Sequence, residues 1–312
     1  MGGIHGAIDP AAAIRSMFDL LDAGFTTFDL ADHYGPAEDF IGEFLRQLAA
    51  QRDSRVGAVQ AFTKWVPRPA RMTRTVVEQA VDRSCRRMGV QTLDLLQFHW
   101  WEYADHNYLD ALRHLADLRE EGRIRHLALT NFDTEHLKII RDAGIKIVSN
   151  QVQYSLIDQR PAVQMAKFCQ ENGIQLLTYG TVCGGLLSER YLGRPELKAK
   201  EMTTASLTKY NGMIDAWGGW GLFQELLGAL GNIARKHRVS IANVAVRSIL
   251  DRSAVTGVIV GCRLGMTKHI ADNRRIFDLQ LDEEDRGQIA GVTRKGQNLF
   301  ERIGDCGDEY RG

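Results

Sequence analysis

The sequence predicts an α/β fold in which parallel strands alternate with helices. Short apolar runs of strand length alternate with segments whose apolar residues recur every three or four positions, as on one face of a helix. A glycine closes five of the ten helical segments, where a left-handed terminal residue is favoured. This alternation continues along most of the 312 residues and is typical of βα units that build a parallel sheet.

Seven segments are predicted to be strands, because each is a run of apolar and β-branched residues that stops at a loop signal. The first ends at Asp29, and the chain breaks soon afterwards at Gly35 and Pro36. The others are Val56–Thr63, Leu93–Phe98, Ile124–Thr130, Lys146–Gln151, Ile174–Tyr179 and Val255–Val260.

Helices are predicted between these strands. The first begins with Asp9 as N-cap and Pro10 as first helical residue, and it ends at Gly24. The later helices are Phe40–Leu48, Val77–Met88, Leu109–Glu121, Glu135–Ala143, Ala162–Glu171, Leu222–His237, Ser240–Asp251, Met266–Arg275 and Leu281–Val292. Ser240 and Asp282 are the expected N-caps of two of them.

One long stretch departs from this rhythm. Residues Gly184 to Gly221 contain several glycines and Pro195 and show no clear period, so we expect an extended active-site loop there. The C-terminal helix and a polar tail cover about residues 281–312. We expect a single domain over residues 1–312.

Composition excludes several classes of protein. Lysine and arginine (39) balance aspartate and glutamate (39), which argues against nucleic acid or a membrane surface as partner. The five cysteines form no C-x-x-C pair, which indicates a reducing compartment, and we expect a cytoplasmic protein. No H-E-x-x-H or clustered Cys/His pattern is present, so no metal is expected. The oligomeric state stays open.

The candidate chemistry begins with Asp29, which lies inside an apolar run. An unpaired carboxylate would be costly there, so Asp29 needs a cation. Lys64 ends the next apolar run and His99 ends the third. Tyr34 follows Asp29 by five residues.

Three motifs, F-D-x-A-D-x-Y-G, F-T-K-W and L-D-L-x-x-x-H-W, contain Asp29, Tyr34, Lys64 and His99 in chain order. They resemble the catalytic tetrad motifs of the aldo-keto reductase superfamily. The resemblance implies a (β/α)₈ TIM barrel, of which this chain lacks the first strand. We therefore expect an opened seam between the strand of Asp29 and Val255–Val260, a tendency to aggregate and weak activity.

The resemblance also implies a role for each member of the tetrad. Tyr34 would be the general acid, and the ammonium of Lys64 would lower its pKa. Asp29 would hold Lys64, and His99 would donate a hydrogen bond to the substrate oxygen. A nicotinamide cofactor would supply the hydride.

Further motifs resemble the superfamily's cofactor site. The expected cofactor-binding residues, besides Asp29, are Thr130, Asn131, Gln151, Tyr179, Gly180, Thr181, Gly261, Cys262, Arg263, His269 and Asn273. Thr130 replaces a usual serine, and Gly180 and Thr181 depart from a usual Ser-Pro. Positive charge at Arg263 favours NADPH, with NADH as the alternative. The sequence contains no G-x-G-x-x-G motif, so it does not predict a Rossmann site.

Trp65 and Trp100 each follow a tetrad residue and are expected to contact the substrate. Trp101 and Trp217 are as consistent with capping of apolar surface as with closing the pocket. The resemblance thus implies NADP-dependent reduction of an aldehyde or ketone to an alcohol without a metal, and the reverse oxidation is equally allowed. Two alternatives are a cofactor-binding regulatory subunit, as in potassium-channel β subunits, and an N-terminally truncated, weakly active enzyme.

Overall fold

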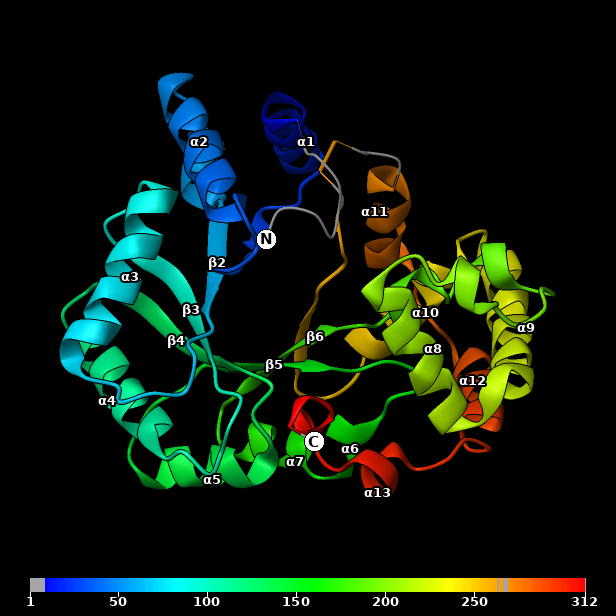
Figure 1. The fold of residues 1–312 in the computed structure, drawn as a ribbon. Helices are drawn as coiled ribbons and strands as arrows, with labels where there is room; N and C mark the ends of the chain where they lie inside the picture. The colour runs from blue at the N-terminus through cyan, green and yellow to red at the C-terminus, as the bar shows by residue number, and fades with distance from the viewer. Residues whose placement is uncertain (1–8, 263, 266–268, 312) are drawn as a thin grey trace. The chain divides into compact units, whose positions relative to one another are not determined.

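The computed structural model describes residues 9–262, 264–265 and 269–311 of the chain (Figure 1). By its internal contacts the chain forms two compact units. The first comprises Met1–Gln151, Cys262–Lys268 and Tyr310–Gly312, and the second comprises Val152–Gly261 and His269–Glu309. The expectation of a single domain therefore stays a prediction.

Within the residues that the structure describes, seven strands form one sheet and follow one another in chain order. They are β1 (Thr27–Asp29), β2 (Gln60–Trp65), β3 (Leu93–His99), β4 (Ile124–Thr130), β5 (Ser149–Gln153), β6 (Gln175–Tyr179) and β7 (Val255–Val258). The strand pairs with a defined register are parallel. The α/β class and the seven predicted strands are confirmed, against eight strands in a complete barrel.

The described part of the first unit carries five helices: α1 (Pro10–Asp22), α2 (Ala37–Ala50), α3 (Arg74–Met88), α4 (Asn107–Glu120) and α5 (Thr134–Asp142). Asp9 caps α1 as predicted, because its carboxylate accepts a hydrogen bond from the Ala11 amide at 3.1 Å. Gly89 closes α3 in the left-handed conformation. Helices α2, α3 and α4 pack in chain order beside β2 to β4 (Figure 1).

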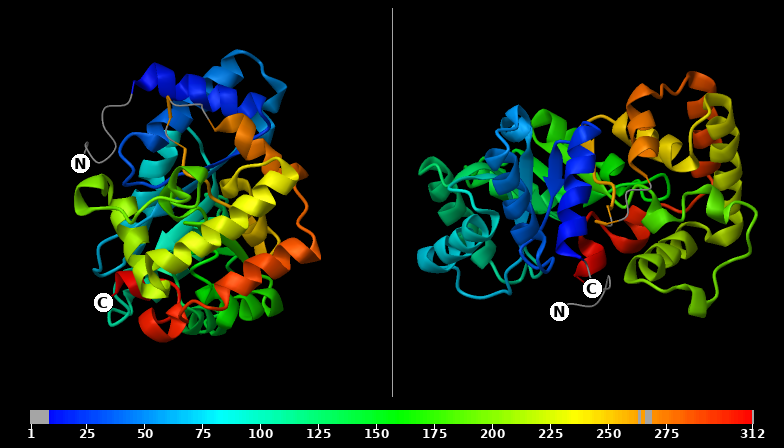
Figure 2. Two further views of the ribbon diagram at one scale, coloured as in Figure 1. Left: turned by 90° about the vertical axis from the view of Figure 1, so that its right-hand side faces the viewer. Right: turned by 90° about the horizontal axis from the view of Figure 1, so that it is seen from above.

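The second unit carries eight helices among its described residues. They are α6 (Arg160–Val163), α7 (Met165–Glu171), α8 (Ala205–Trp217), α9 (Gly219–His237), α10 (Ile241–Leu250), α11 (Ile270–Asp278), α12 (Glu283–Thr293) and α13 (Leu299–Ile303). The long helix α9 packs against both α10 and α12 (Figure 2). Leu226, Leu227 and Leu230 are fully buried on its inner face. The predicted N-caps Ser240 and Asp282 are confirmed.

The prediction of an extended loop from Gly184 to Gly221 is wrong in its secondary structure. The hydroxyl of Thr204 caps α8 by accepting a hydrogen bond from the Leu207 amide at 3.1 Å. The buried face of α8 has a helical spacing, which glycines within and after the helix obscure in the sequence. Its large members are Tyr210, Met213, Ile214 and Trp217.

Several element boundaries also differ from the prediction. β2 begins only at Gln60, because Ser54–Ala58 forms the 3₁₀ turn η1, capped by Asp53. The helix predicted over Ala162–Glu171 is two helices that break at Gln164. α11 begins at Ile270, and residues 266–268 lie outside the described residues. None of the described helices combines the length and apolar character needed to cross a membrane.

Candidate active site

Three tetrad residues lie at the carboxyl ends of neighbouring strands in the first unit. Asp29 is the last residue of β1, Lys64 the penultimate residue of β2, and His99 the last residue of β3. Because the strands are parallel, these ends share one edge of the sheet. Tyr34 lies in the loop that follows β1.

Asp29 and Lys64 form the ion pair that the sequence requires. The Lys64 side chain is 4% exposed and the Asp29 side chain 15%. The Lys64 ammonium also donates a hydrogen bond to the carbonyl oxygen of Leu30 at 2.8 Å. Burial lowers the pKa of Lys64, and the carboxylate of Asp29 opposes that shift.

Tyr34 does not have the lowered pKa that the sequence analysis expects. Loss of solvation, and next the carboxylate of Asp29, raise the pKa of Tyr34 to about 12. The Lys64 ammonium lies 5.5 Å from the centroid of the Tyr34 ring, but its charge is offset by Asp29. The residue as a whole is 51% exposed, which limits how much solvation the phenol loses and lets a substrate reach it.

Arg87 of α3 holds the loop that carries Tyr34. Its guanidinium donates to the carbonyl oxygen of Asp32 at 2.9 Å and to that of Gly35, on either side of the tyrosine. It also binds the carboxylate of Glu38 at 2.9 Å. Glu38 is fully buried, so this charge needs its partner. Sequence analysis missed Arg87, which gives no local signal for this contact.

Two glutamines next to the tetrad bind the same carboxylate oxygen of Asp29. Gln97 and Gln151 donate to Asp29 Oδ1 at 2.8 and 2.9 Å. Sequence analysis assigned Gln151 to the cofactor and missed Gln97. A signal exists, because Gln97 stands two residues before His99 and so faces the same side of β3.

Aromatic residues surround His99, which is itself buried. The centroid of the Trp101 ring lies 4.3 Å from that of the His99 ring. The centroid of the Tyr310 ring lies 5.8 Å from that of Trp101. Trp101 is 39% exposed. Trp100, in contrast, is fully buried and its indole N–H donates to the carbonyl oxygen of Glu102 at 2.6 Å. Trp101 is therefore better placed than Trp100 to meet a substrate.

The C-terminal tail, expected only as a polar segment, contributes to this region of the first unit. The guanidinium of Arg311 donates to the carbonyl oxygens of Trp100 and Asn131 at 3.0 and 2.7 Å. Its Cζ atom lies 3.8 Å from the centroid of the Tyr103 ring. These contacts hold Tyr310 beside His99, with ring centroids 6.4 Å apart.

Comparisons with known proteins point to one family. The model of the Aldo/keto reductase family matches residues 1–294. The chain belongs to the aldo/keto reductase family. Among relatives, pyridoxal reductase of Arabidopsis thaliana is 25% identical over 92% of this chain and 80% of its own. L-glyceraldehyde 3-phosphate reductase of Escherichia coli K12 is 25% identical over 97% and 89%.

Flagellar radial spoke protein 5 of Chlamydomonas reinhardtii is 28% identical over 76% of this chain, which spans only 56% of that protein. Among solved structures, glycerol dehydrogenase from Gluconobacter oxydans matches with a TM-score of 0.77 at 21% identity, over 95% of this chain and 89% of its own. An aldo-keto reductase from Klebsiella pneumoniae in complex with NADPH matches with a TM-score of 0.69 at 18% identity, over 93% and 87%. These matches support the barrel-type fold.

The end of β4 in this aldo/keto reductase suits a carboxamide such as that of nicotinamide. Thr130 is the register partner of both His99 and Gln151. Its hydroxyl is buried and has no hydrogen-bond partner among the described residues. Asn131 follows in the left-handed conformation, with φ of 56°. A buried free hydroxyl beside a buried amide fits a polar ligand group.

The other expected cofactor residues of the aldo/keto reductase belong mainly to the second unit. The ring of Tyr179 lies 5.4 Å from the Lys209 ammonium of α8. Gly180 has a φ of 72°, and a Cβ atom there would clash with the Tyr210 hydroxyl, which explains the departure from serine. Thr181 donates to the carbonyl oxygen of Tyr154 at 3.1 Å.

The remaining expected cofactor residues lie between the end of β7 and the first turn of α11. Gly261 and Cys262 are exposed, and His269 precedes α11. The Asn273 amide donates to the carbonyl oxygen of His269 at 2.8 Å, one turn apart. Arg263 lies outside the described residues, so its expected role stays a prediction.

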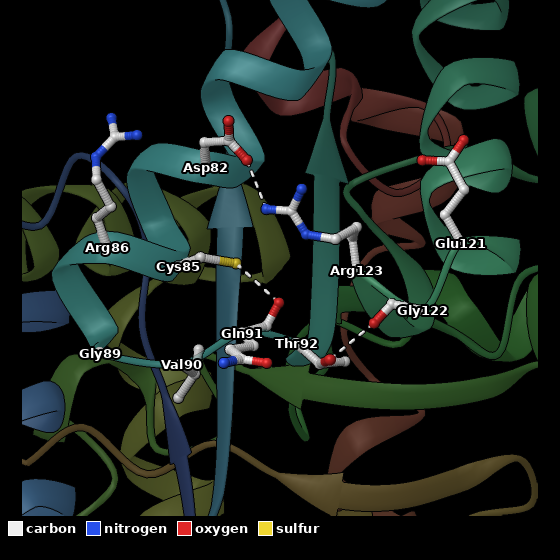
Figure 3. Close-up of a pocket in the computed structure, with 10 residues that line it drawn as sticks. All are labelled: Asp82, Cys85, Arg86, Gly89, Val90, Gln91, Thr92, Glu121, Gly122 and Arg123. Carbon is white, nitrogen blue, oxygen red and sulfur yellow. Dashed lines mark hydrogen bonds and ion pairs between the residues drawn. The ribbon is translucent and has the colours of Figure 1, made fainter.

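A separate cavity of about 670 Å³ lies at the opposite end of the strands in the first unit (Figure 3). Its walls include Thr92, just before β3, and Arg123, just before β4. Arg123 is paired with Asp82 at 2.5 Å. Active sites of barrels lie at the carboxyl ends of the strands, so this cavity is not the carbonyl site.

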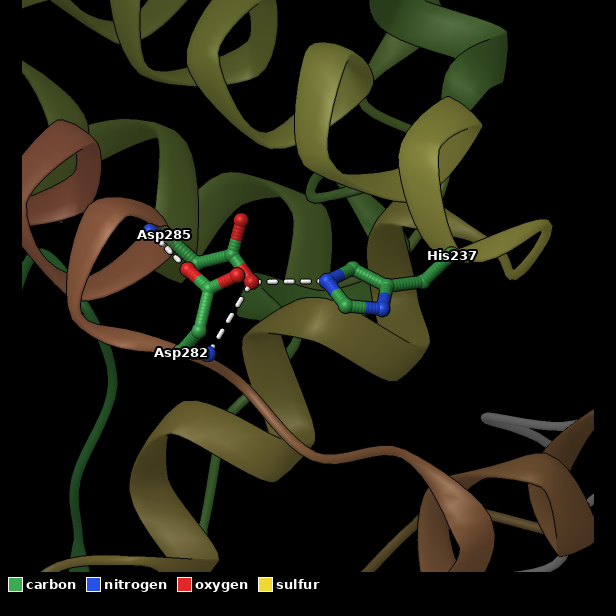
Figure 4. A group of neighbouring side chains, drawn as sticks. All are labelled: His237, Asp282 and Asp285. Carbon is green, nitrogen blue, oxygen red and sulfur yellow. Dashed lines mark hydrogen bonds and ion pairs between the residues drawn. The ribbon is translucent and has the colours of Figure 1, made fainter.

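One cluster in the second unit groups metal-type ligands: His237, Asp282 and Asp285 (Figure 4). His237 Nε2 lies 2.6 Å from Asp285 Oδ2. The ammonium of Lys236 lies 2.6 Å from Asp282 and 2.9 Å from Asp285. The ammonium of a lysine thus already contacts both carboxylates, and the cluster caps the start of α12.

Proposed function

We propose that this aldo/keto reductase reduces an aldehyde or ketone to an alcohol, with NADPH as hydride donor and Tyr34 as proton donor. The observation that carries the proposal is the grouping of Tyr34, His99 and the Asp29–Lys64 pair at one edge of the first unit. Relatives named as pyridoxal, glyceraldehyde phosphate and glyoxal reductases support a carbonyl substrate.

The proton comes from Tyr34 in this mechanism. With its pKa at about 12, the phenol is protonated at neutral pH and can donate to the substrate oxygen. His99 donates a hydrogen bond to the same oxygen and orients it. Lys64 stabilises the phenolate that remains, and Asp29 fixes the position of Lys64.

Thr130 and Gln151 are the groups proposed to hold the carboxamide of the cofactor, since both are buried and are register partners of each other, and Thr130 is also the register partner of His99. When bound, the nicotinamide supplies the hydride that the substrate carbon accepts. Neighbouring structures that contain NADP or NADPH support this cofactor class. NADPH is proposed in preference to NADH because the positive charge of Arg263 suits the additional phosphate of NADPH.

The test is NADPH consumption by the purified chain over a panel of aldehydes and ketones, with product analysis. Tyr34→Phe should lower turnover by a factor of about 10²–10⁴. Its affinity for NADPH should stay unchanged, because the phenol serves the substrate. Tyr191→Phe, the same change at a tyrosine of the second unit that has no role in the proposed site, is the control and should retain turnover. More than a tenth of wild-type turnover in Tyr34→Phe would remove Tyr34 from this role.

The alternative function is cofactor binding without turnover. The relative named as a flagellar radial spoke protein shows that the similarity extends to a component of an assembly. Binding of NADPH, measured by fluorescence, separates the two functions when turnover is measured in parallel. Binding without turnover of any carbonyl would favour the regulatory role.

A further inference from the structure

Gln97 is a buried amide that the roles proposed above leave without a function. It lies in β3, and its side chain is fully buried. Its register partner on β2 is Lys64, so the two side chains project from the same face of the sheet. A buried amide needs hydrogen-bond partners, because burial without them is unfavourable. Those partners define its role.

Both the NH₂ group and the oxygen of the Gln97 amide form hydrogen bonds. Its Nε2 atom donates to Asp29 Oδ1 at 2.8 Å. Its Oε1 atom accepts from Gln151 Nε2 at 2.5 Å. Gln151 Nε2 also donates to Asp29 Oδ1, at 2.9 Å. Both hydrogens of the Gln151 amide are therefore engaged, and Gln151 offers a ligand its oxygen.

We infer that Gln97 is a positioning residue that fixes both Asp29 and Gln151. Its donated bond holds one carboxylate oxygen of Asp29 while the other binds Lys64. Its accepted bond selects the orientation in which Gln151 presents an oxygen, which suits the NH₂ of a carboxamide. The inference rests on the proposed function, because these positions matter only if Lys64 and Gln151 serve catalysis and cofactor binding.

Through its hydrogen bonds, the Gln97 side chain links the proposed proton-donor site to the proposed cofactor site. Lys64 supports the proton donor and Gln151 the cofactor, and Gln97 lies between them on the neighbouring strand. A shift of Gln97 should therefore alter both the rate of the chemical step and the affinity for NADPH. A residue that only fills the core would alter stability alone.

Two substitutions separate these outcomes. Gln97→Met keeps the length of the side chain and removes both hydrogen bonds. Gln97→Glu keeps the shape: its protonated acid donates to Asp29 and accepts from Gln151, as the amide does. Leu96→Val, on the same strand with its side chain on the other face, is the control for lost packing.

Gln97→Met should lower kcat by about 10–100-fold at every pH and weaken NADPH binding. Gln97→Glu should keep most activity at low pH and lose it as pH rises. Asp29, Lys64 and, two residues along the same strand, His99 are the titratable groups that face position 97. Burial and the Asp29 charge would hold the pKa of the introduced carboxyl above its usual value, with Lys64 opposing them. Leu96→Val should change stability but neither kcat nor the pH profile.

Wild-type turnover, and its loss in Tyr34→Phe, test the proposed function, whereas the ratios of variant to wild type test Gln97. A kcat for Gln97→Met within about threefold of wild type would overturn the inference, since misplacement should cost far more. A pH-independent ratio for Gln97→Glu would overturn it too. If the wild type binds NADPH without turnover, an affinity of Gln97→Met equal to that of Leu96→Val overturns it. If the wild type does neither, the inference falls with the function.

Discussion

Lys64 has two tasks in the proposed mechanism that oppose each other in this structure. It must neutralise the partly buried Asp29, and it must stabilise the phenolate of Tyr34. Its ammonium binds Asp29 and the carbonyl oxygen of Leu30, so little of its charge acts on the phenol. Loss of solvation, and next the carboxylate of Asp29, therefore raise the pKa of Tyr34 without an opposing shift from Lys64. The Tyr34 phenol therefore stays protonated at neutral pH, as the proposed proton donor must.

The raised pKa makes a prediction about stability at high pH. Between the ordinary value of 10.0 and about 12, folded Tyr34 keeps a proton that the unfolded chain loses. The folded state then binds more protons, so stability falls as pH rises through this window and is fully retained below it. Urea unfolding should show a steeper loss for wild type than for Tyr34→Phe. Equal losses would mean that Tyr34 titrates as in the unfolded chain.

At the scale of elements, α3 determines where the loop between β1 and α2 lies. Arg87 contacts that loop on both sides of Tyr34 and also neutralises the buried Glu38. We expect Arg87→Met to lower kcat by about tenfold or more through displacement of Tyr34. Unfolding free energy should fall by about 1–3 kcal/mol.

Arg87→Lys should restore stability in part but not kcat, because an ammonium cannot reproduce the planar fork of donors. Arg83→Met, one turn earlier on α3 and exposed, is the control. A kcat equal to wild type in Arg87→Met would show that α3 supports the loop without setting the position of Tyr34.

In the second unit, Gly180 connects β6 to the 3₁₀ turn η2 (Cys183–Gly185) in a conformation that side chains disfavour. Its φ is 72°, and Tyr210 of α8 occupies the space of a Cβ atom. Gly180→Ala should therefore destabilise the fold by at least about 1–2 kcal/mol. Gly212→Ala, within α8 and in open space, should stabilise it by up to about 1 kcal/mol. Urea unfolding of both variants provides the comparison.

Elements with strong local signals were predictable from the sequence, and elements decided by packing were not. The capped helix α1 and strand β3 lie close to their predicted bounds, since caps and apolar periods act locally. Helix α8 was missed because its glycines resemble a loop, whereas its stability comes from a buried aromatic face. The tetrad followed from motifs, but Arg87, Gln97 and Tyr310 are brought in by tertiary contacts that spacing does not encode.

At the scale of the whole molecule, β5 belongs to both compact units. Ser149 to Gln151 lie in the first unit, and Val152 and Gln153 in the second. Gln151 donates to Asp29 in the first unit, while Gln153 donates to Asp158 in the second at 2.6 Å. One short strand thus takes part in two hydrogen-bond networks, and local unfolding of β5 would disturb both.

We therefore expect the chain to unfold in a single cooperative transition despite its two compact units. A ligand that binds only the folded chain stabilises it by about 2.7 kcal/mol at 100 times its Kd. Saturating NADPH should therefore raise the midpoint of that one transition. Calorimetry with and without NADPH measures this, and Tyr34→Phe, which should bind NADPH normally, should show the same rise. Two transitions, of which NADPH shifts only one, would contradict the single domain and show that the units unfold independently.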